Sequence, residues 1–211
     1  DGVSSIERLK TLTSRLAWAG GLLGLLGLVQ FVTGDVLVDR ISIPGLRPAE
    51  FDLEQRAGFI RPSGTASHPI EFGIILAMVV PFALHTAFHS RNRHLILRWV
   101  PALTLGISMA LTFSRSAYVG VVVALAILFF GWPARRRLTF TAGVAVLCLG
   151  LFAAVPRLFG TITSLFRNVG NDPSITSRTD SYDLATEFFL RYPLFGRGLG
   201  TFLPKLRIFD N

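Results

Sequence analysis

Five long apolar runs limit what this chain can fold into more than any other feature does. They are Leu16–Thr33, Ile70–Phe88, Trp99–Phe113, Ala117–Trp132 and Leu138–Val155. A helix needs about 20 apolar residues to cross the roughly 30 Å hydrocarbon core of a bilayer, so the third and fourth runs are short. Hydrophobic residues make up 51% of the 211 residues and charged residues only 16%. We therefore expect an all-α polytopic membrane protein with five transmembrane helices.

Basic residues form three short clusters that flank the apolar runs. If every run crosses the bilayer, all three clusters fall on the same side of it. Cytoplasmic loops carry an excess of Lys and Arg, so we expect this side, and with it the N-terminal end, to be cytoplasmic. The net charge of +8 therefore indicates membrane topology rather than binding to nucleic acid. The clusters are Arg8, Lys10 and Arg15, then Arg91, Arg93 and Arg98, then Arg135, Arg136 and Arg137.

The outer side then receives the segment Gly34–Pro69, the tip Ser114–Ser116 and the tail from Pro156 onward. We expect a transmembrane helix bundle over residues 1–155 and the start of a large extracytoplasmic loop over residues 156–211. Because the chain starts without a methionine and ends inside this loop, we expect it to be part of a longer protein.

Local patterns predict secondary structure in the outer segments. Residues 36–38 and 41–43 are typical of a short strand pair before a Pro-Gly turn. In Pro156–Val169 the apolar side chains fall on one face, which indicates an amphipathic helix at the membrane surface. Ser177 with Asp180 resembles a capping box, so a second helix is expected to start there.

Glycines recur in the first run, and Gly20, Gly24 and Gly27 fall near one face of it. Small residues at such spacing let two helix backbones approach closely inside a membrane. We therefore expect this face to pack directly against another helix.

Arg115 is the side chain that most suggests a function. A straight helix over Trp99–Phe113 rises only about 22 Å, which would put the guanidinium at or just below the outer membrane interface. An arginine there is unfavourable unless it reaches water or an anion. No acidic residue lies between Phe72 and Asn171, so its partner must come from an outer loop, from Glu71 or from a ligand such as a phosphate. The alternative is that Arg115 only anchors the turn.

Arg61 and His68 flank a segment of Pro, Gly and small hydroxyl residues just before the second run. The small side chains leave room for a ligand, so both residues are candidates for a site. The alternative for His68 is a helix cap, with Pro69 in the first turn. Arg178, at the start of the second tail helix, is a further candidate, and its alternative is a solvated surface residue.

The His, Cys and acidic residues do not form a metal-ligand pattern. His85 and His89 are one helical turn apart, but no third ligand accompanies them. The segment Gly196–Gly200 lacks the spacing of a dinucleotide-binding fingerprint. We therefore expect neither a metal nor another cofactor.

Three outer segments, residues 61–69 (RPSGTASHP), 111–116 (LTFSRS) and 193–202 (PLFGRGLGTF), occur in this order along the chain. Together they resemble the motifs of the O-antigen ligase and Wzy-type polysaccharide polymerase family, over roughly Arg61 to the end of the chain. The resemblance implies a multi-helix enzyme of the GT-C type in the bacterial inner membrane, surrounded by membrane lipids.

The resemblance also implies a reaction. Members of this family move a glycan from an undecaprenyl diphosphate carrier to a sugar hydroxyl. The acceptor is a lipid A core sugar in ligases and another repeat unit in polymerases. The displacement is inverting and uses no metal, so arginines on the outer side stabilise the diphosphate leaving group.

Matched motif by motif, the resemblance makes Arg115 and Arg178 the clamp for the diphosphate, with Arg61 as a third candidate. The acceptor hydroxyl needs a base within hydrogen-bond reach. Ligases usually have a histidine after the Gly-rich motif, near where this chain has Asp210. Asp210 or His68 would take that role, or the base would lie beyond the end of the chain. The missing histidine favours a polymerase over a ligase.

Two other functions are alternatives. A transporter or flippase for lipid-linked sugars would use the same arginines to bind phosphate without chemistry, although few polar residues interrupt the fourth and fifth runs. A non-catalytic membrane scaffold would explain the basic inner surface, but not the order of the motifs on the outer side.

Overall fold

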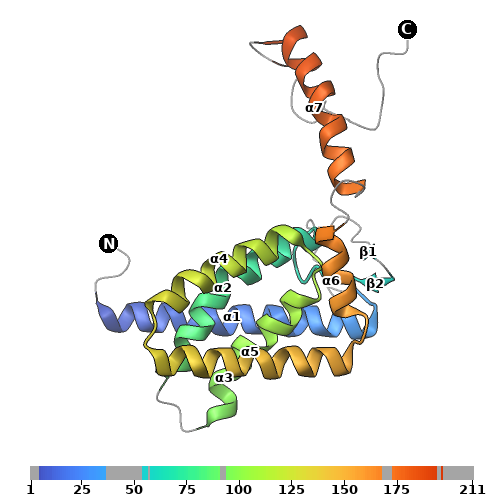
Figure 1. Ribbon diagram of the computed structural model, residues 1–211. Helices are drawn as coiled ribbons and strands as arrows, with labels where there is room; N and C mark the ends of the chain where they lie inside the picture. The colour runs from blue at the N-terminus through green and yellow to red at the C-terminus, as the bar shows by residue number, and fades with distance from the viewer. Residues whose placement is uncertain are drawn as a thin grey trace, which may run out of the picture. The chain divides into compact units, whose positions relative to one another are not determined.

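Most of the described chain is helical (Figure 1). The computed structural model describes residues 5–36, 54–56, 58–90, 94–167, 173–193 and 196. Within these residues it contains seven helices and one pair of short strands, which confirms the predicted all-α class. The elements are α1 (Ile6–Thr33), β1 (Gln55–Arg56), β2 (Phe59–Ile60), α2 (Pro69–His89), α3 (Leu95–Ala110), α4 (Arg115–Gly131), α5 (Ala134–Ala154), α6 (Leu158–Arg167) and α7 (Pro173–Arg191).

Each of the five apolar runs forms a helix. α1, α2 and α5 contain 28, 21 and 21 residues and are long and apolar enough to cross a membrane. α3 and α4 are apolar but shorter, with 16 and 17 residues. Length and composition therefore support three of the five predicted transmembrane helices, and the crossing of the membrane by α3 and α4 stays a prediction.

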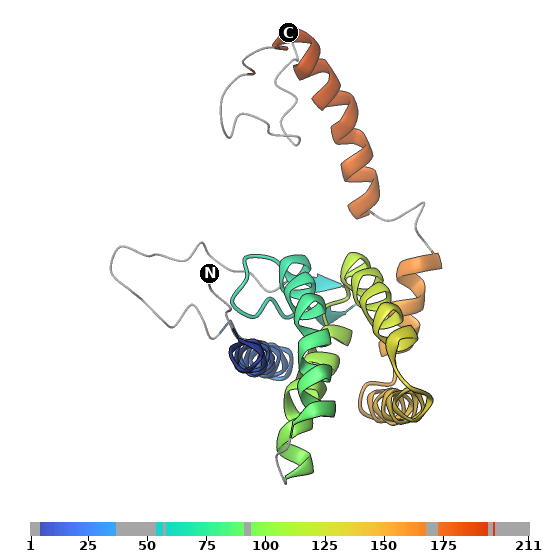
Figure 2. The same cartoon turned by 90° about the vertical axis from the view of Figure 1, so that its left-hand side faces the viewer.

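The chain divides into two compact units, Asp1–Ile162 and Thr163–Asn211, and each is described by itself. In the first unit α2 is central and packs against α1, α3 and α4, while α1 also packs along α3. Helices α1 to α5 alternate in direction (Figure 1), and Figure 2 looks along α1 and α5 with α2 and α3 between them. The first turns of α2 and α4 therefore lie at the same end of this unit as the last turns of α1, α3 and α5. The domain boundary at residue 155 stays a prediction.

The glycines of α1 allow the close packing that the sequence predicts. Gly20, Gly21, Gly24 and Gly27 are all buried. A Cβ atom at Gly21 would lie only 2.8 Å from the Cα atom of Pro101 in α3. The backbones of α1 and α3 are therefore too close to admit a side chain between them.

The connection between α3 and α4 lies earlier in the chain than predicted. The expected tip, Ser114–Ser116, is instead the N-cap and the first two residues of α4, and the chain turns at Leu111–Ser114. All four residues of this turn are buried, and Phe113 has a positive φ of 48°. Because the turn is packed inside the protein, its backbone polar groups need protein partners.

A two-residue strand pair precedes α2. β1 and β2 pair antiparallel, with Gln55 opposite Ile60. Gly58 between them has a φ of +79°, a conformation that glycine adopts without strain. The strand pair expected at residues 36–38 and 41–43 lies almost entirely outside the described residues.

The tail contains two helices, as predicted, but the second starts earlier than expected. α6 covers most of the predicted amphipathic segment, and its Leu158 and Leu165 are buried. α7 starts at Pro173, so Ser177 and Asp180 lie inside it and the predicted capping box is wrong. Proline suits the first position of a helix because its φ is fixed near the helical value and its missing N–H has no helical partner there.

Replacing Gly21 with alanine is expected to destabilise the protein by about 1–3 kcal/mol, because the new methyl group would push α1 away from α3. The measurement is the thermal unfolding midpoint in detergent, which should fall. Gly143→Ala in α5 is the matched control, since a Cβ atom there meets nothing within 4 Å. An equal midpoint for the two variants would contradict the close α1–α3 contact.

Candidate functional site

A buried glutamine near the end of α1 holds the segment that leads into α2. Gln30 Nε2 donates to the Gly64 carbonyl at 2.8 Å, and its Oε1 accepts the N–H groups of Ser63 at 3.2 Å and Gly64 at 2.7 Å. Gly64 has a φ of +61°, and a Cβ atom there would lie 2.4 Å from the ring of Phe72. The segment is thereby fixed against α1, and only glycine fits at position 64.

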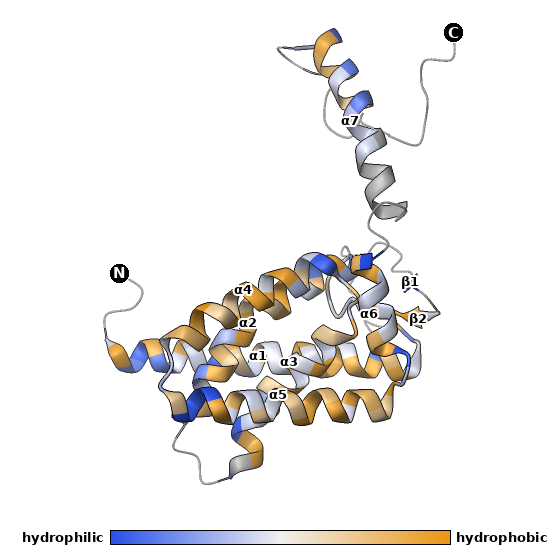
Figure 3. Cartoon of the chain, viewed as in Figure 1, coloured by the Kyte–Doolittle hydropathy of each residue, from blue (hydrophilic) through white to orange (hydrophobic). Residues whose placement is uncertain are grey.

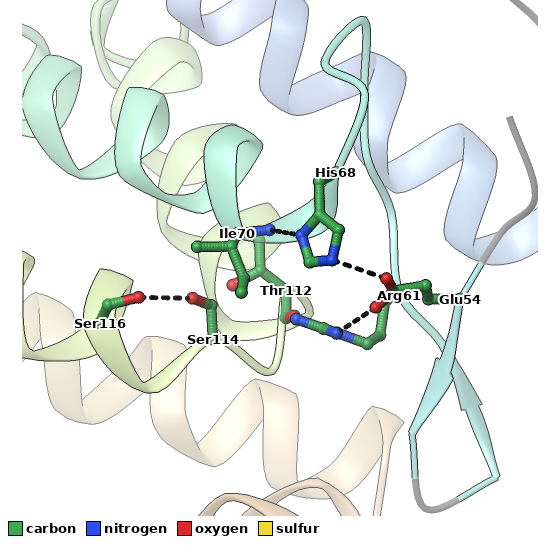
Figure 4. Close-up of polar contacts among 7 residues, drawn as sticks. All are labelled: Glu54, Arg61, His68, Ile70, Thr112, Ser114 and Ser116. Atoms are coloured by element: carbon green, nitrogen blue, oxygen red, sulfur yellow. Dashed lines mark hydrogen bonds and ion pairs between the residues drawn. The ribbon is translucent and has the colours of Figure 1, made fainter. Parts of the chain in front are cut away.

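Arg61 joins three parts of the chain (Figure 4). Its Nη1 donates to Glu54 Oε2 at 2.5 Å, and its Nε donates to the Thr112 carbonyl at 2.9 Å. Its backbone N–H donates to the Glu54 carbonyl at 2.8 Å. Glu54 precedes β1 and Thr112 lies in the α3–α4 turn, so one side chain ties the strand pair to the turn that begins α4.

The guanidinium of Arg61 is a buried cation. Arg61 is only 5% exposed, whereas the side chain of Glu54 is 41% exposed. Burial lowers the pKa of Arg61 and the Glu54 carboxylate opposes this, but arginine stays charged because its ordinary pKa is so high. Arg61 Nη2 is buried and meets no hydrogen-bond acceptor among the described residues. The cation is therefore neutralised by one carboxylate and keeps one further donor.

His68 caps α2, which confirms the capping interpretation. Its Nδ1 accepts the N–H of Ile70 at 3.1 Å, with Pro69 at the first helical position. Its Nε2 lies 2.6 Å from Glu54 Oε1. Because Nδ1 accepts a hydrogen bond, the proton of the neutral ring is on Nε2 and is donated to Glu54. Both ring nitrogens are thus engaged, and Glu54 bridges His68 and Arg61 (Figure 4).

Three aromatic rings hold the same elements together. Phe59 of β2 stacks on Phe113 of the α3–α4 turn, with 5.2 Å between ring centroids. Phe59 also stacks on Phe31 of α1, with 6.4 Å between the ring centroids. These contacts give apolar support to the elements that Gln30 and Arg61 join through polar groups.

Arg115 is the first residue of α4 and follows the N-cap Ser114. It is partly buried, and the Ser114 and Ser116 hydroxyl oxygens beside it lie 3.3 Å apart. α2 approaches closely here, because a Cβ atom at Gly73 would lie 2.8 Å from the Cβ of Ala117. The N–H groups at the start of a helix favour negative charge, and Arg115 adds a formal positive charge at the same place. This arrangement suits a phosphate.

The predicted site residues are only partly brought together. Arg61 and His68 share one carboxylate, and Arg61 also contacts the turn that precedes Arg115. Arg178 lies in the second turn of α7, not at its start, and its side chain is outside the described residues. Asp210 also lies outside the described residues. The roles of these residues in a clamp or as a base stay predictions.

The described residues bring no metal-ligand cluster together. No three His, Cys, Asp or Glu side chains gather there as ligands would. His85 and His89 stack with 4.2 Å between their ring centroids, and His89 Nδ1 lies 2.9 Å from the His85 carbonyl oxygen.

Comparison with known proteins assigns the second half of the chain to a family. The sequence profile of the O-antigen ligase family, Wzy_C, matches residues 100–210, more than half of the chain. The chain belongs to the O-antigen ligase family. This confirms the predicted family resemblance, and two of the three motifs, residues 111–116 and 193–202, lie inside the matched region. No curated protein sequence and no solved structure gives a match.

Membership of the O-antigen ligase family, together with the apolar helices, indicates a membrane protein with glycan-transfer activity of the ligase or polymerase kind. The matched region begins within α3 and includes the α3–α4 turn and Arg115. Arg61 and His68 precede it, so their part in the site is supported by geometry alone.

Two residues of the site were not predicted from the sequence. Gln30 is an amide in an otherwise apolar run, and a polar residue within a membrane helix is a signal that could have identified it. Glu54 gives no such signal, because it is one of several acids in its segment. Its pairing with Arg61 depends on the strand pair and on the turn at Gly58, which bring residues 54 and 61 together.

Replacing Glu54 with glutamine is expected to destabilise the protein by about 1–3 kcal/mol, because it leaves a buried guanidinium without its counter-charge. Chemical unfolding in detergent measures the loss. Glu187→Gln is the matched control. The Glu187 carboxylate lies 2.6 Å from Arg191, but both of these side chains are about half exposed. Such a pair contributes about 0.5 kcal/mol or less. If both variants lose the same stability, the Arg61 pair is no more than a surface ion pair.

Proposed function

We propose that this chain belongs to an inner-membrane enzyme that transfers a glycan from undecaprenyl diphosphate to a sugar hydroxyl, with inversion and without a metal. The basic ends of its helices would face the cytoplasm, and the α3–α4 turn and the tail would face the outside. The fixed start of α4, with Arg115 as its first residue inside the matched family region, is the observation that carries this proposal.

The start of α4 supports binding of the diphosphate. The helix N-terminus offers N–H donors, and Arg115 offers a guanidinium that can bind two phosphate oxygens at once. Arg61 holds the Thr112 carbonyl three residues before Arg115, so the turn cannot shift freely. A preorganised cation of this kind stabilises the charge that develops as the glycosidic bond to the diphosphate breaks.

The other two arginines would complete the clamp in different ways. Arg178 would approach the diphosphate from α7 as a second cation. Arg61 is already neutralised by Glu54, so its contribution would come from its remaining Nη2 donor and from the position it gives to the α4 start. We therefore expect Arg115 to contribute the most to diphosphate binding.

The acceptor hydroxyl requires a base as it attacks the anomeric carbon. The new glycosidic bond forms at that carbon, the bond to the diphosphate oxygen breaks, and the hydroxyl proton passes to the base. Asp210 is the proposed base. His68 could serve only if its bond from the Ile70 N–H opened, because neither ring nitrogen otherwise has a lone pair available. We therefore favour a positioning role for His68.

Replacing Arg115 with alanine is expected to reduce glycan transfer by about 10²–10³-fold, the usual effect of removing one preorganised charge stabiliser. The assay uses the full-length protein in lipid with undecaprenyl diphosphate-linked oligosaccharide and EDTA, and follows the released undecaprenyl diphosphate. Arg15→Ala in α1 is the control, because it removes an arginine at the other end of the first unit. Full activity of Arg115→Ala would contradict the proposed mechanism. So would a protein without the substitution that transfers the glycan only when EDTA is left out of the assay.

The same assay distinguishes the related functions. A growing glycan ladder without any added acceptor indicates a polymerase, which the absence of the expected histidine favours. Release only after addition of lipid A core indicates a ligase. Binding of the lipid-linked glycan without release under either condition would indicate a transporter instead.

A further inference from the structure

A long cavity lies between α3 and α5, away from the site described above. Its volume is about 1050 Å³. Leu103 and Ile107 of α3 and Val146 and Leu147 of α5 belong to its apolar wall. Figure 3 shows that α5 is hydrophilic only at its start and apolar along the rest of its length. The cavity is therefore suited to a hydrocarbon chain over most of its extent.

The apolar wall is long enough for a lipid chain. On α5 the lining extends from Thr139 to Ala154, which at about 1.5 Å per residue corresponds to about 22 Å. One leaflet of a bilayer contributes about half of the roughly 30 Å hydrocarbon core. A single acyl chain of a phospholipid can therefore extend along the cavity from the interface to the middle of the bilayer.

Three arginines line the end of the cavity where α3 and α5 start. They are Arg98, Arg135 and Arg136. Arg98 Nε is buried and meets no acceptor among the described residues. The structure gives none of the three side chains an ion pair within the described residues, and the sequence has no acidic residue between Phe72 and Asn171. This end of the cavity therefore has positive charge that the helices around it cannot neutralise.

The neighbouring Arg137 differs from these three arginines because its guanidinium binds backbone carbonyl groups of the protein. Its Nε donates to the Trp132 carbonyl at 2.8 Å, and its Nη2 donates to the Phe130 carbonyl at 2.9 Å. It also lies over the ring of Phe129. Arg137 thus binds the carbonyl groups at the end of α4, whereas Arg135 and Arg136 line the cavity.

Aromatic rings lie near the arginines, an arrangement that is typical of a membrane interface. Phe88 packs edge-on against Trp99 and Trp132, with ring centroids 5.1 and 5.2 Å apart, and Trp132 packs against Phe140 in the same way at 5.2 Å. Tryptophan is enriched at the level of lipid headgroups. An apolar groove, a cationic end and an interfacial aromatic cluster thus occur together.

We propose that this cavity binds an anionic phospholipid, with one acyl chain along α3 and α5 and its phosphate against Arg98, Arg135 and Arg136. Charge complementarity selects this occupant. An apolar helix in the cavity would leave the arginines unneutralised, and a zwitterionic lipid would bring a cationic amine beside them. The site is separate from the proposed diphosphate site, because α3 and α5 start at the opposite end of the first unit from α4. The proposal does not depend on glycan transfer.

The test is native mass spectrometry of the full chain released from detergent in the presence of phosphatidylglycerol or phosphatidylcholine. Phosphatidylglycerol should be retained with at least about tenfold preference. Replacing Arg98, Arg135 and Arg136 with glutamine should weaken its binding by about fivefold for each arginine, the effect expected of a basic residue near an anionic lipid surface. The control replaces Arg8, Lys10 and Arg15, which line no part of the cavity.

A second variant distinguishes loss of lipid binding from a folding defect caused by the three arginine substitutions. Gly150→Leu fills the apolar part of the cavity without changing any charge, since a Cβ atom there meets nothing within 4 Å. It should reduce retention of phosphatidylglycerol while keeping the thermal unfolding midpoint. Equal retention of the two lipids, or equal loss in the control triple variant, would overturn the proposal. So would unchanged retention in Gly150→Leu.

Discussion

The contact between the Arg61 guanidinium and the Thr112 carbonyl is the interaction on which the end of the first unit around the start of α4 depends. It brings together a strand pair near the start of α2 and a turn between α3 and α4, which are far apart in the sequence. The turn is buried, so its carbonyl groups need protein donors. A charged donor meets this need with a strong hydrogen bond. Glu54 then becomes necessary, because without it the cation would be buried alone.

Close packing of α1, α2 and α3 makes this network possible. The glycines of α1 let Pro101 and Thr104 of α3 approach the α1 backbone directly. That approach places Gln30 at the end of α1 within reach of the Ser63–Gly64 segment. In a membrane, where backbone groups have no water to bind, irregular segments are tolerated only when protein groups satisfy them. Gln30 and Arg61 supply these groups for two adjacent irregular segments.

The sequence predicted the helices better than it predicted their ends and contacts. Long apolar runs and the glycine stripe of α1 are periodic signals, and the structure contains the helices and the close contact they indicate. The early end of α3 was missed because Leu111 and Phe113 continue the apolar pattern although they belong to a turn. The start of α7 was missed because Pro173 outweighs the capping pattern of residues 177–180. The Glu54 pairing could not be predicted, because a two-residue strand pair creates it.

The arginines at the two ends of the first unit differ in whether a carboxylate neutralises them. At the start of α4, Glu54 already neutralises Arg61, so a phosphate ligand there would gain little Coulomb energy from that residue and would depend mainly on Arg115 and the helix N-terminus. At the other end, the arginines of the cavity lie in a stretch of sequence that has no Asp or Glu between residues 72 and 171. A phosphate bound there would meet three cations that form no ion pair within the described residues. The end with the start of α4 thus has its arginine held in a network of protein contacts, whereas the end with the starts of α3 and α5 has cationic side chains that suit the anionic headgroup proposed above.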